Sequence, residues 1–118
     1  MNKKVNIAID AMGGDNSPEK IIEEIKISLK NNEDNYFILF GNEELLRKEI
    51  KKNKLPIENY EIINTKDKIL DKESPFTAAK KGKESSMWKA IESLKNKKAD
   101  ICLSAGNTGA LLLYQDYY

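Results

Sequence analysis

Apolar residues along this chain form two kinds of pattern, short continuous runs and longer stretches with helical spacing. The short runs have the length and composition of buried β-strands, and they fall at residues 5–9, 36–40, 60–63 and 101–103. The stretches between them carry apolar residues every three or four positions, as one face of an α-helix does. The order β-α-β-α-β-loop-α-β-α predicts an α/β fold with a mainly parallel sheet covered by helices.

Capping residues predict where the first two helices begin. Ser17 is expected to cap the first helix, with Pro18 at its first position, since proline needs no hydrogen bond there. Asn42 is expected to cap the second helix. The residues expected to face the core are Ile21, Ile22, Ile25 and Leu29 in the first helix, and Leu45, Leu46 and Ile50 in the second.

The second half of the chain is less regular at its start. Residues 64–83 contain a proline, a glycine and many charges, which is typical of a functional loop, with one short helix expected near residues 77–80. A further helix is predicted to begin at Ser85 or Ser86. The residues expected on its apolar face are Met87, Ala90, Ile91 and Leu94.

Composition excludes several classes of function. The net charge of +1 gives no electrostatic reason to expect nucleic-acid binding. Histidine is absent, which removes the commonest general base and the commonest metal ligand. The single cysteine, Cys102, lies in an apolar strand and is interpreted as buried and inert rather than as a nucleophile. Neither a signal peptide nor an apolar run long enough for a membrane span is visible, so a cytoplasmic location is expected.

A first candidate site follows the first predicted strand, where Asp10, Gly13, Gly14 and Asp15 stand close together in sequence. In open α/β sheets, ligands bind at the carboxyl ends of the strands. The two glycines allow the backbone to turn and approach a ligand, while the aspartates could orient a lysine, accept a hydrogen bond or hold a cation. Spacing alone favours a simpler interpretation, a tight turn whose aspartates accept hydrogen bonds from backbone amides.

A second candidate site follows the last predicted strand at the same sheet edge. It contains Ser104, Gly106, Asn107, Thr108 and Gly109, and another helix is expected to begin near its end. Hydroxyls and backbone amides at a helix N-terminus suit a phosphate, or an oxyanion that develops on a carbonyl. A helix cap with a glycine turn explains these residues equally well.

A third candidate site joins the long loop to the helix that follows it. Lys83, Ser85 and Ser86 could close over an anionic ligand. On this pattern alone, a solvated run of charges followed by a capping serine is the better interpretation.

Taken together, the three segments resemble the PlsX-type phosphate:acyl-carrier-protein acyltransferases. The matching stretches are 7–18, 83–87, 99–100 and 104–111, in the family's order and spacing. The resemblance implies an α/β/α sandwich similar to isocitrate and isopropylmalate dehydrogenases and to phosphotransacetylases. It also implies a reaction in which inorganic phosphate attacks the thioester of acyl-acyl carrier protein, giving an acyl phosphate for phospholipid synthesis. No cofactor and no metal ligand are predicted among these residues. Members of the family are homodimers that associate peripherally with the membrane.

The resemblance assigns roles to the candidate residues. Asp10, Asp15 and Asn107 would be catalytic, with the aspartates organising the site. The remaining candidate residues would bind phosphate or the acyl carbonyl. They are Gly13, Gly14, Lys83, Ser85, Ser86, Ser104, Gly106, Thr108 and Gly109.

Length is where the sequence departs from the family, because members are about three times as long. Residues 1–118 are therefore expected to be a single N-terminal α/β portion of a longer, here truncated, acyltransferase. One alternative is a truncated, non-catalytic remnant that at most binds anions or a partner. Another is a different α/β enzyme, such as a phosphotransacetylase or a nucleotide-dependent dehydrogenase, although no dinucleotide fingerprint is present.

Overall fold

The computed structural model describes residues 5–12, 18–65 and 85–104. Its elements are β1 (Asn6–Asp10), α1 (Glu19–Asn31), β2 (Tyr36–Gly41), α2 (Glu43–Asn53), the 3₁₀ turn η1 (Ile57–Asn59), β3 (Tyr60–Asn64), α4 (Ser86–Lys95) and β4 (Ile101–Ser104). Every strand and helix that the sequence pattern predicts within these ranges is present. The short helix predicted near residues 77–80 and the last helix lie outside the described residues.

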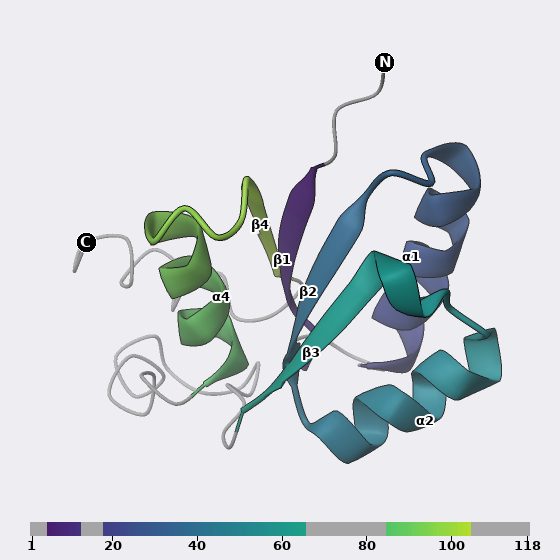
Figure 1. Cartoon of the computed structure of the whole chain (residues 1–118). Helices are drawn as coiled ribbons and strands as arrows, with labels where there is room; N and C mark the ends of the chain where they lie inside the picture. Colours follow the sequence, from purple (N-terminus) through teal and green to yellow (C-terminus); the bar gives the residue numbers. More distant parts are fainter. Residues whose placement is uncertain (1–4, 13–17, 66–84, 105–118) are drawn as a thin grey trace.

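The four strands form one parallel sheet in the order β3-β2-β1-β4. The chain moves outward from β1 to β2 and β3, and then crosses back to place β4 on the other side of β1 (Figure 1). The order of the strands therefore reverses between β1 and β4. Such a reversal is the topological switch point at which ligands bind in open α/β sheets.

Helices cover both faces of the sheet, which confirms the predicted α/β/α arrangement (Figure 1). On one face, α1 and α2 pack on alternate residues of β1 and β2, in a core that includes Ile9, Ile22, Leu39 and Leu46. On the other face, α4 packs through Ala90 on the intervening strand residues. The two-residue period of the strands thus divides the apolar side chains between two cores.

The start of α1 differs from the prediction by one position. The helix begins at Glu19, and Pro18 occupies the N-cap position, where its carbonyl oxygen accepts from the Ile22 N–H at 3.1 Å. Ser17 lies outside the described residues. The predicted stripe is confirmed, since Ile22 and Ile25 are buried while Ile21 and Leu29 pack at the edge of the same core.

In α2 the predicted cap is confirmed and one core residue is wrong. The Asn42 Oδ1 accepts from the Leu45 N–H at 3.1 Å. Leu46 and Ile50, four residues apart on one face, are buried, whereas Leu45 is 45% exposed. Adjacent helix positions are turned by about 100° from each other, so Leu45 and Leu46 cannot both point directly at the sheet.

In α4 the buried stripe lies to one side of the predicted one. Met87, Ala90 and Ile91 are buried as expected, but Leu94 is 40% exposed and Ser93 is buried instead. The line from Ser86 through Ala90 to Ser93 has the spacing i, i+4, i+7 and consists of small residues. Small residues allow the helix axis to approach the sheet closely, and this explains why two serines, rather than Leu94, occupy the stripe.

None of the helices in the described ranges is both long and apolar enough to cross a bilayer.

Candidate functional site

The carboxyl edge of the sheet brings together the ends of β1 and β4. Asp10, the last residue of β1, lies directly opposite Ser104, the last residue of β4, in the parallel register. The two glycine-bearing segments identified in the sequence therefore leave the sheet from neighbouring strands, on the two sides of the switch point. The candidate residues outside the described ranges are Gly13, Gly14, Asp15, Lys83, Gly106, Asn107, Thr108 and Gly109, and their roles stay predictions.

Asp10 is a buried carboxylate with defined hydrogen bonds. It is 3% exposed, and its Oδ1 accepts from the Ser86 hydroxyl and, at 3.2 Å, from the Met12 N–H. A buried carboxylate is costly to desolvate unless donors compensate it, and hydrogen bonds to charged groups are about twice as strong as neutral ones. The edge of the sheet thus holds a fixed negative charge at the switch point.

The start of α4 supplies one of these donors. Ser86 is the first residue of α4 and is 1% exposed, so its hydroxyl meets the carboxylate away from solvent. The positive end of the helix dipole at the same place also favours a carboxylate. The preceding Ser85 is fully buried, and its Oγ accepts from the Trp88 N–H at 3.1 Å as the helix cap. Both predicted serines therefore reach the sheet edge, and both have a structural role there.

The contact between Met12 and Gly41 was not predicted from the sequence. The Met12 side chain lies over Gly41, the last residue of β2, such that a Cβ at position 41 would be 2.7 Å from its Cγ and 2.9 Å from its Sδ. The residue before Met12 is also held against β2, because the Ala11 N–H donates to the Phe40 carbonyl at 3.0 Å. The chain leaving β1 is therefore held against β2 for two further residues. A glycine at the end of an otherwise bulky strand was the one available signal.

Asn64 is a polar residue at this edge that was not predicted from the sequence. Its Oδ1 accepts from the Glu43 N–H at 3.0 Å and so connects the end of β3 to the start of α2. The role is structural, because the side chain satisfies an amide that has no partner within the helix.

Cys102 lies near the candidate site but is poorly suited to react. It is partly buried and pairs with Ala8 in the register of β4 and β1. Burial, with a smaller contribution from the negative charge of Asp10, raises the pKa of the thiol to about 11. Because the thiolate is the nucleophile, this shift agrees with the interpretation of Cys102 as an inert residue.

Comparison of the sequence with known proteins identifies the family of this chain. The sequence profile described as "Fatty acid synthesis protein" matches residues 5–115. The chain belongs to this family. The match begins just before β1 and continues past β4, so it includes all the described elements and the predicted segments between them.

Relatives of this family member carry a more specific name. A phosphate acyltransferase of Pelagibacter ubique is 51% identical over 113 residues, which are 96% of this chain and 33% of that protein. Phosphate acyltransferases of Rhodopseudomonas palustris and Clostridium acetobutylicum are 41% and 42% identical, over 95% and 90% of this chain and 32% of each relative. The chain thus spans about a third of the length of these curated relatives.

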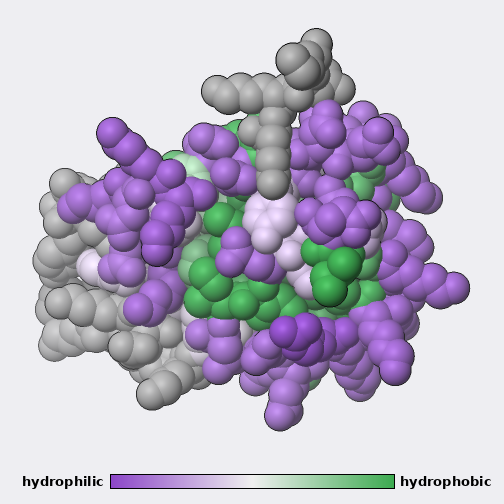
Figure 2. All heavy atoms as spheres, in the orientation of Figure 1, coloured by the Kyte–Doolittle hydropathy of each residue, from purple (hydrophilic) through white to green (hydrophobic). Residues whose placement is uncertain are grey.

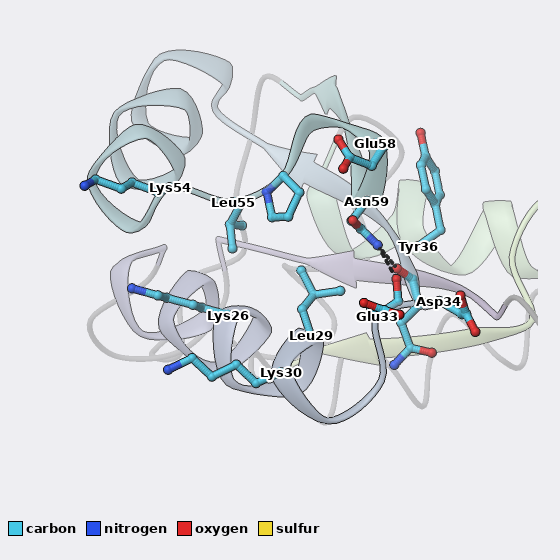
Figure 3. A pocket seen from close by; sticks show the side chains of 12 residues that line it. Lys26, Leu29, Lys30, Glu33, Asp34, Tyr36, Lys54, Leu55, Glu58 and Asn59 are labelled. Carbon is cyan, nitrogen blue, oxygen red and sulfur yellow. Dashed lines mark hydrogen bonds between the residues drawn. The ribbon is translucent and has the colours of Figure 1, made fainter. Parts of the chain in front are cut away.

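One hollow in this family member lies at the opposite edge of the sheet. Its volume is about 570 Å³, and it is bordered by the ends of α1 and α2, by η1 and by the start of β2 (Figure 3). One wall is fixed by the Asn59 side chain, whose Nδ2 donates to the Glu33 and Asn35 carbonyls at 2.8 and 3.0 Å. Its charged residues are three lysines and three acids, namely Lys26, Lys30, Lys54, Glu33, Asp34 and Glu58. Because these charges balance, they do not select an anion.

A second hollow lies on the face that α4 covers. Its volume is about 440 Å³, and its floor includes Ile38, Phe40 and Ile63 of β2 and β3. Figure 2 shows hydrophobic side chains gathered between α4 and β3 on a face that is otherwise mostly hydrophilic. The other border is α4 itself, through residues that include Lys89 and Ser93.

A metal site finds no support in the described parts of the chain. There, no three histidine, cysteine or acidic side chains lie close enough together to hold a metal ion.

Proposed function

We propose that this chain contributes the phosphate- and carbonyl-binding edge of a phosphate acyltransferase. The enzyme would transfer an acyl group from acyl-acyl carrier protein to inorganic phosphate, in the pathway of phospholipid synthesis. The observation that carries the proposal is the buried Asp10 carboxylate, held by Ser86 at the switch point beside the end of β4. Membership of the family and the name of its relatives support the chemistry.

The proposed reaction needs positioning more than it needs an enzyme nucleophile. A phosphate oxygen attacks the thioester carbonyl carbon, and the carbonyl oxygen takes up negative charge in a tetrahedral intermediate. Collapse of the intermediate breaks the C–S bond, giving an acyl phosphate and the thiolate of the carrier protein, which then takes up a proton. Preorganised hydrogen-bond donors stabilise the developing oxyanion, and correct placement of the two substrates lowers the entropic part of the barrier.

Asp10 is assigned to organisation of the site rather than to contact with phosphate. Two unit charges of the same sign at 4 Å repel each other by about 4 kcal/mol at an effective dielectric constant of about 20. A carboxylate that touched the phosphate would therefore weaken its binding. In its observed place Asp10 instead holds the Ser86 hydroxyl and the Met12 amide, and so fixes the two segments that border the switch point.

Direct contact with the substrates is assigned to the segment that follows β4. Ser104, Gly106, Asn107, Thr108 and Gly109 would provide amides and neutral side chains for phosphate and for the acyl carbonyl. Asp15, with Gly13 and Gly14, would border the site on the β1 side, and Lys83 would close it. Ser85 and Ser86 would act mainly by holding the start of α4 at the edge.

A chimera tests the proposal, because it supplies the part of the relatives that this chain does not span. Residues 5–112 of this chain replace the matching third of the Pelagibacter ubique phosphate acyltransferase, and release of carrier-protein thiol is measured with and without phosphate. We expect phosphate-dependent release, and a loss of about 10²-fold or more in kcat for Asn107→Ala, the usual effect of removing one oxyanion donor. A folded chimera without turnover, or an Asn107→Ala variant with unchanged kcat, contradicts the proposal.

A second measurement, combined with the chimera assay, tests the alternative of a non-catalytic binding protein. The 118-residue chain is titrated with inorganic phosphate and its unfolding temperature is measured. Stabilisation by phosphate without turnover in the chimera would support an anion-binding remnant instead.

Assembly and location are part of the proposal. The family resemblance supports a cytoplasmic homodimer with peripheral membrane association, and acyl-acyl carrier protein and phosphate as its partners. Sedimentation of the chimera and its flotation with anionic vesicles test the two physical claims. A monomer that does not float would contradict both of them.

A further inference from the structure

Met12 connects the end of β2 to the carboxylate of Asp10. Its backbone N–H donates to Asp10 Oδ1 at 3.2 Å, the residue is 8% exposed, and its side chain lies over Gly41. A Cβ at position 41 would lie 2.7 Å from the Met12 Cγ, closer than real Cβ atoms come to another heavy atom. The place that the Met12 side chain occupies therefore exists only because residue 41 is glycine.

The requirement at position 41 is for space and not for an unusual backbone conformation. Gly41 belongs to β2, where any residue can adopt the extended backbone, and its carbonyl accepts from the Thr65 N–H at 2.9 Å. The Leu46 Cδ1 would lie 3.2 Å from the same Cβ, so the space beside Gly41 is bounded on a second side. An added methyl group at this position would therefore displace Met12 before it disturbed the strand.

We propose that Met12 is a positioning residue for Asp10 and that Gly41 leaves the space that the Met12 side chain needs. The inference rests on the proposed function, in which Asp10 organises the site. The side chain fixes the Met12 amide, and the amide together with the Ser86 hydroxyl fixes Oδ1 of Asp10. Displacement of the side chain moves the amide away from the carboxylate. Misplacement of a catalytic group by about 1 Å can reduce a rate by about 10²-fold. We therefore expect displacement of the Met12 side chain to lower kcat.

The test uses Gly41→Ala, Met12→Ala and the double variant in the chimera. We expect each single substitution to lower kcat by about tenfold or more while the KM for acyl-acyl carrier protein changes little. The double variant should be no worse than the more affected single variant, because both substitutions remove the same contact. Met12→Leu, a volume-conserving exchange, should keep kcat within about threefold of the unsubstituted chimera. Ile50→Ala is the control, since it opens a cavity in the same core at the far end of α2.

Several results would overturn the inference. If Gly41→Ala and Met12→Ala lower the unfolding temperature as Ile50→Ala does, but leave kcat unchanged well below that temperature, the contact is only structural. Losses that multiply in the double variant would also exclude a shared role. Should Gly41→Ala fail to fold, the comparison of Met12→Ala with Met12→Leu decides in its place.

An inactive unsubstituted chimera would count against the proposed function. The positioning role of Met12 is then tested in the 118-residue chain, without an activity measurement. In the nuclear magnetic resonance spectrum, the Met12 amide resonance should shift on Asp10→Asn substitution, because its acceptor changes. The same substitution in the Gly41→Ala chain should shift it much less. An equal response in both chains would refute the positioning role independently of turnover.

Discussion

Replacement of Ser86 by alanine removes one donor from a carboxylate that is almost entirely buried. Asp10 and Ser86 are 3% and 1% exposed, so water does not readily take the place of the lost hydroxyl. A hydrogen bond to a charged group contributes about 1.5–3 kcal/mol, and we expect a loss of about 2 kcal/mol for this buried pair. For a domain of this size, about 2 kcal/mol corresponds to a decrease of roughly 8 °C in the melting temperature.

The same helix offers a matched control. Ser93 is also buried in α4, at 6% exposure, but its Oγ has no hydrogen-bond partner among the described residues. Removal of an unsatisfied buried hydroxyl relieves a penalty instead of creating one, and alanine is the better helix former at both positions. Ser93→Ala should therefore leave stability unchanged or increase it, whereas Ser86→Ala should decrease it.

The assay is urea-induced unfolding of the 118-residue chain, followed by circular dichroism at two protein concentrations. Asp10→Ala and the double variant Asp10→Ala/Ser86→Ala complete a double-mutant cycle. We expect a coupling energy of about 1–2 kcal/mol, because either single substitution already removes the hydrogen bond between Ser86 and Asp10. Equal effects of Ser86→Ala and Ser93→Ala, or an additive cycle, would refute the assignment of the hydrogen bond as a major stabilising contact.

Three further predictions concern the described core and surface. Burial raises the pKa of the Cys102 thiol to about 11, so stability should fall between about pH 9 and about pH 11, where the unfolded chain has released a proton that the folded chain still holds; unfolding of Cys102→Ala at the same pH values should lack this component. Leu46→Ala should cost about 2–5 kcal/mol and Leu45→Ala less than about 0.5 kcal/mol in urea unfolding, and similar costs would contradict their different burial. Ile101 and Leu103 are 45% and 49% exposed on one side of β4, so the chain should self-associate in sedimentation and the double lysine variant should not; an unchanged sedimentation coefficient would show that another surface is responsible.

The strands and the caps of α2 and α4 were predictable because their signals are local. A continuous apolar run between turn residues is enough to predict β2, and Asn42 caps α2 through its own side chain. Parallel pairing also followed, since strands that alternate with helices leave few other arrangements. None of these predictions needs a contact between distant segments.

The errors came from positions whose environment depends on the whole fold. Leu45 and Leu94 satisfy the helical spacing of their stripes, but both are exposed. The buried positions are taken by Leu46 and Ile50 in α2, and in α4 by residues that include Ala90 and Ser93. Ile101 and Leu103 have the composition of a strand buried on both faces, yet β4 has an exposed side because α1 and α2 lie over β1 and β2. Hydropathy indicates whether a side chain favours burial, whereas the number and order of neighbouring elements determine whether it is buried.

The hydrogen bond between Asp10 and Ser86 shows the same limit at the candidate site. Both residues were identified from sequence, but for separate reasons, and they lie 76 positions apart. Their contact requires that the connection from β3 cross back over β2 and β1 to β4, which places α4 on the second face with its first residue at the carboxyl edge. Had β4 added next to β3 instead, the right-handed crossover rule would have placed α4 on the first face, away from Asp10. The reversal of strand order therefore places β4 beside β1 and also brings to their carboxyl ends the serine that holds the Asp10 carboxylate.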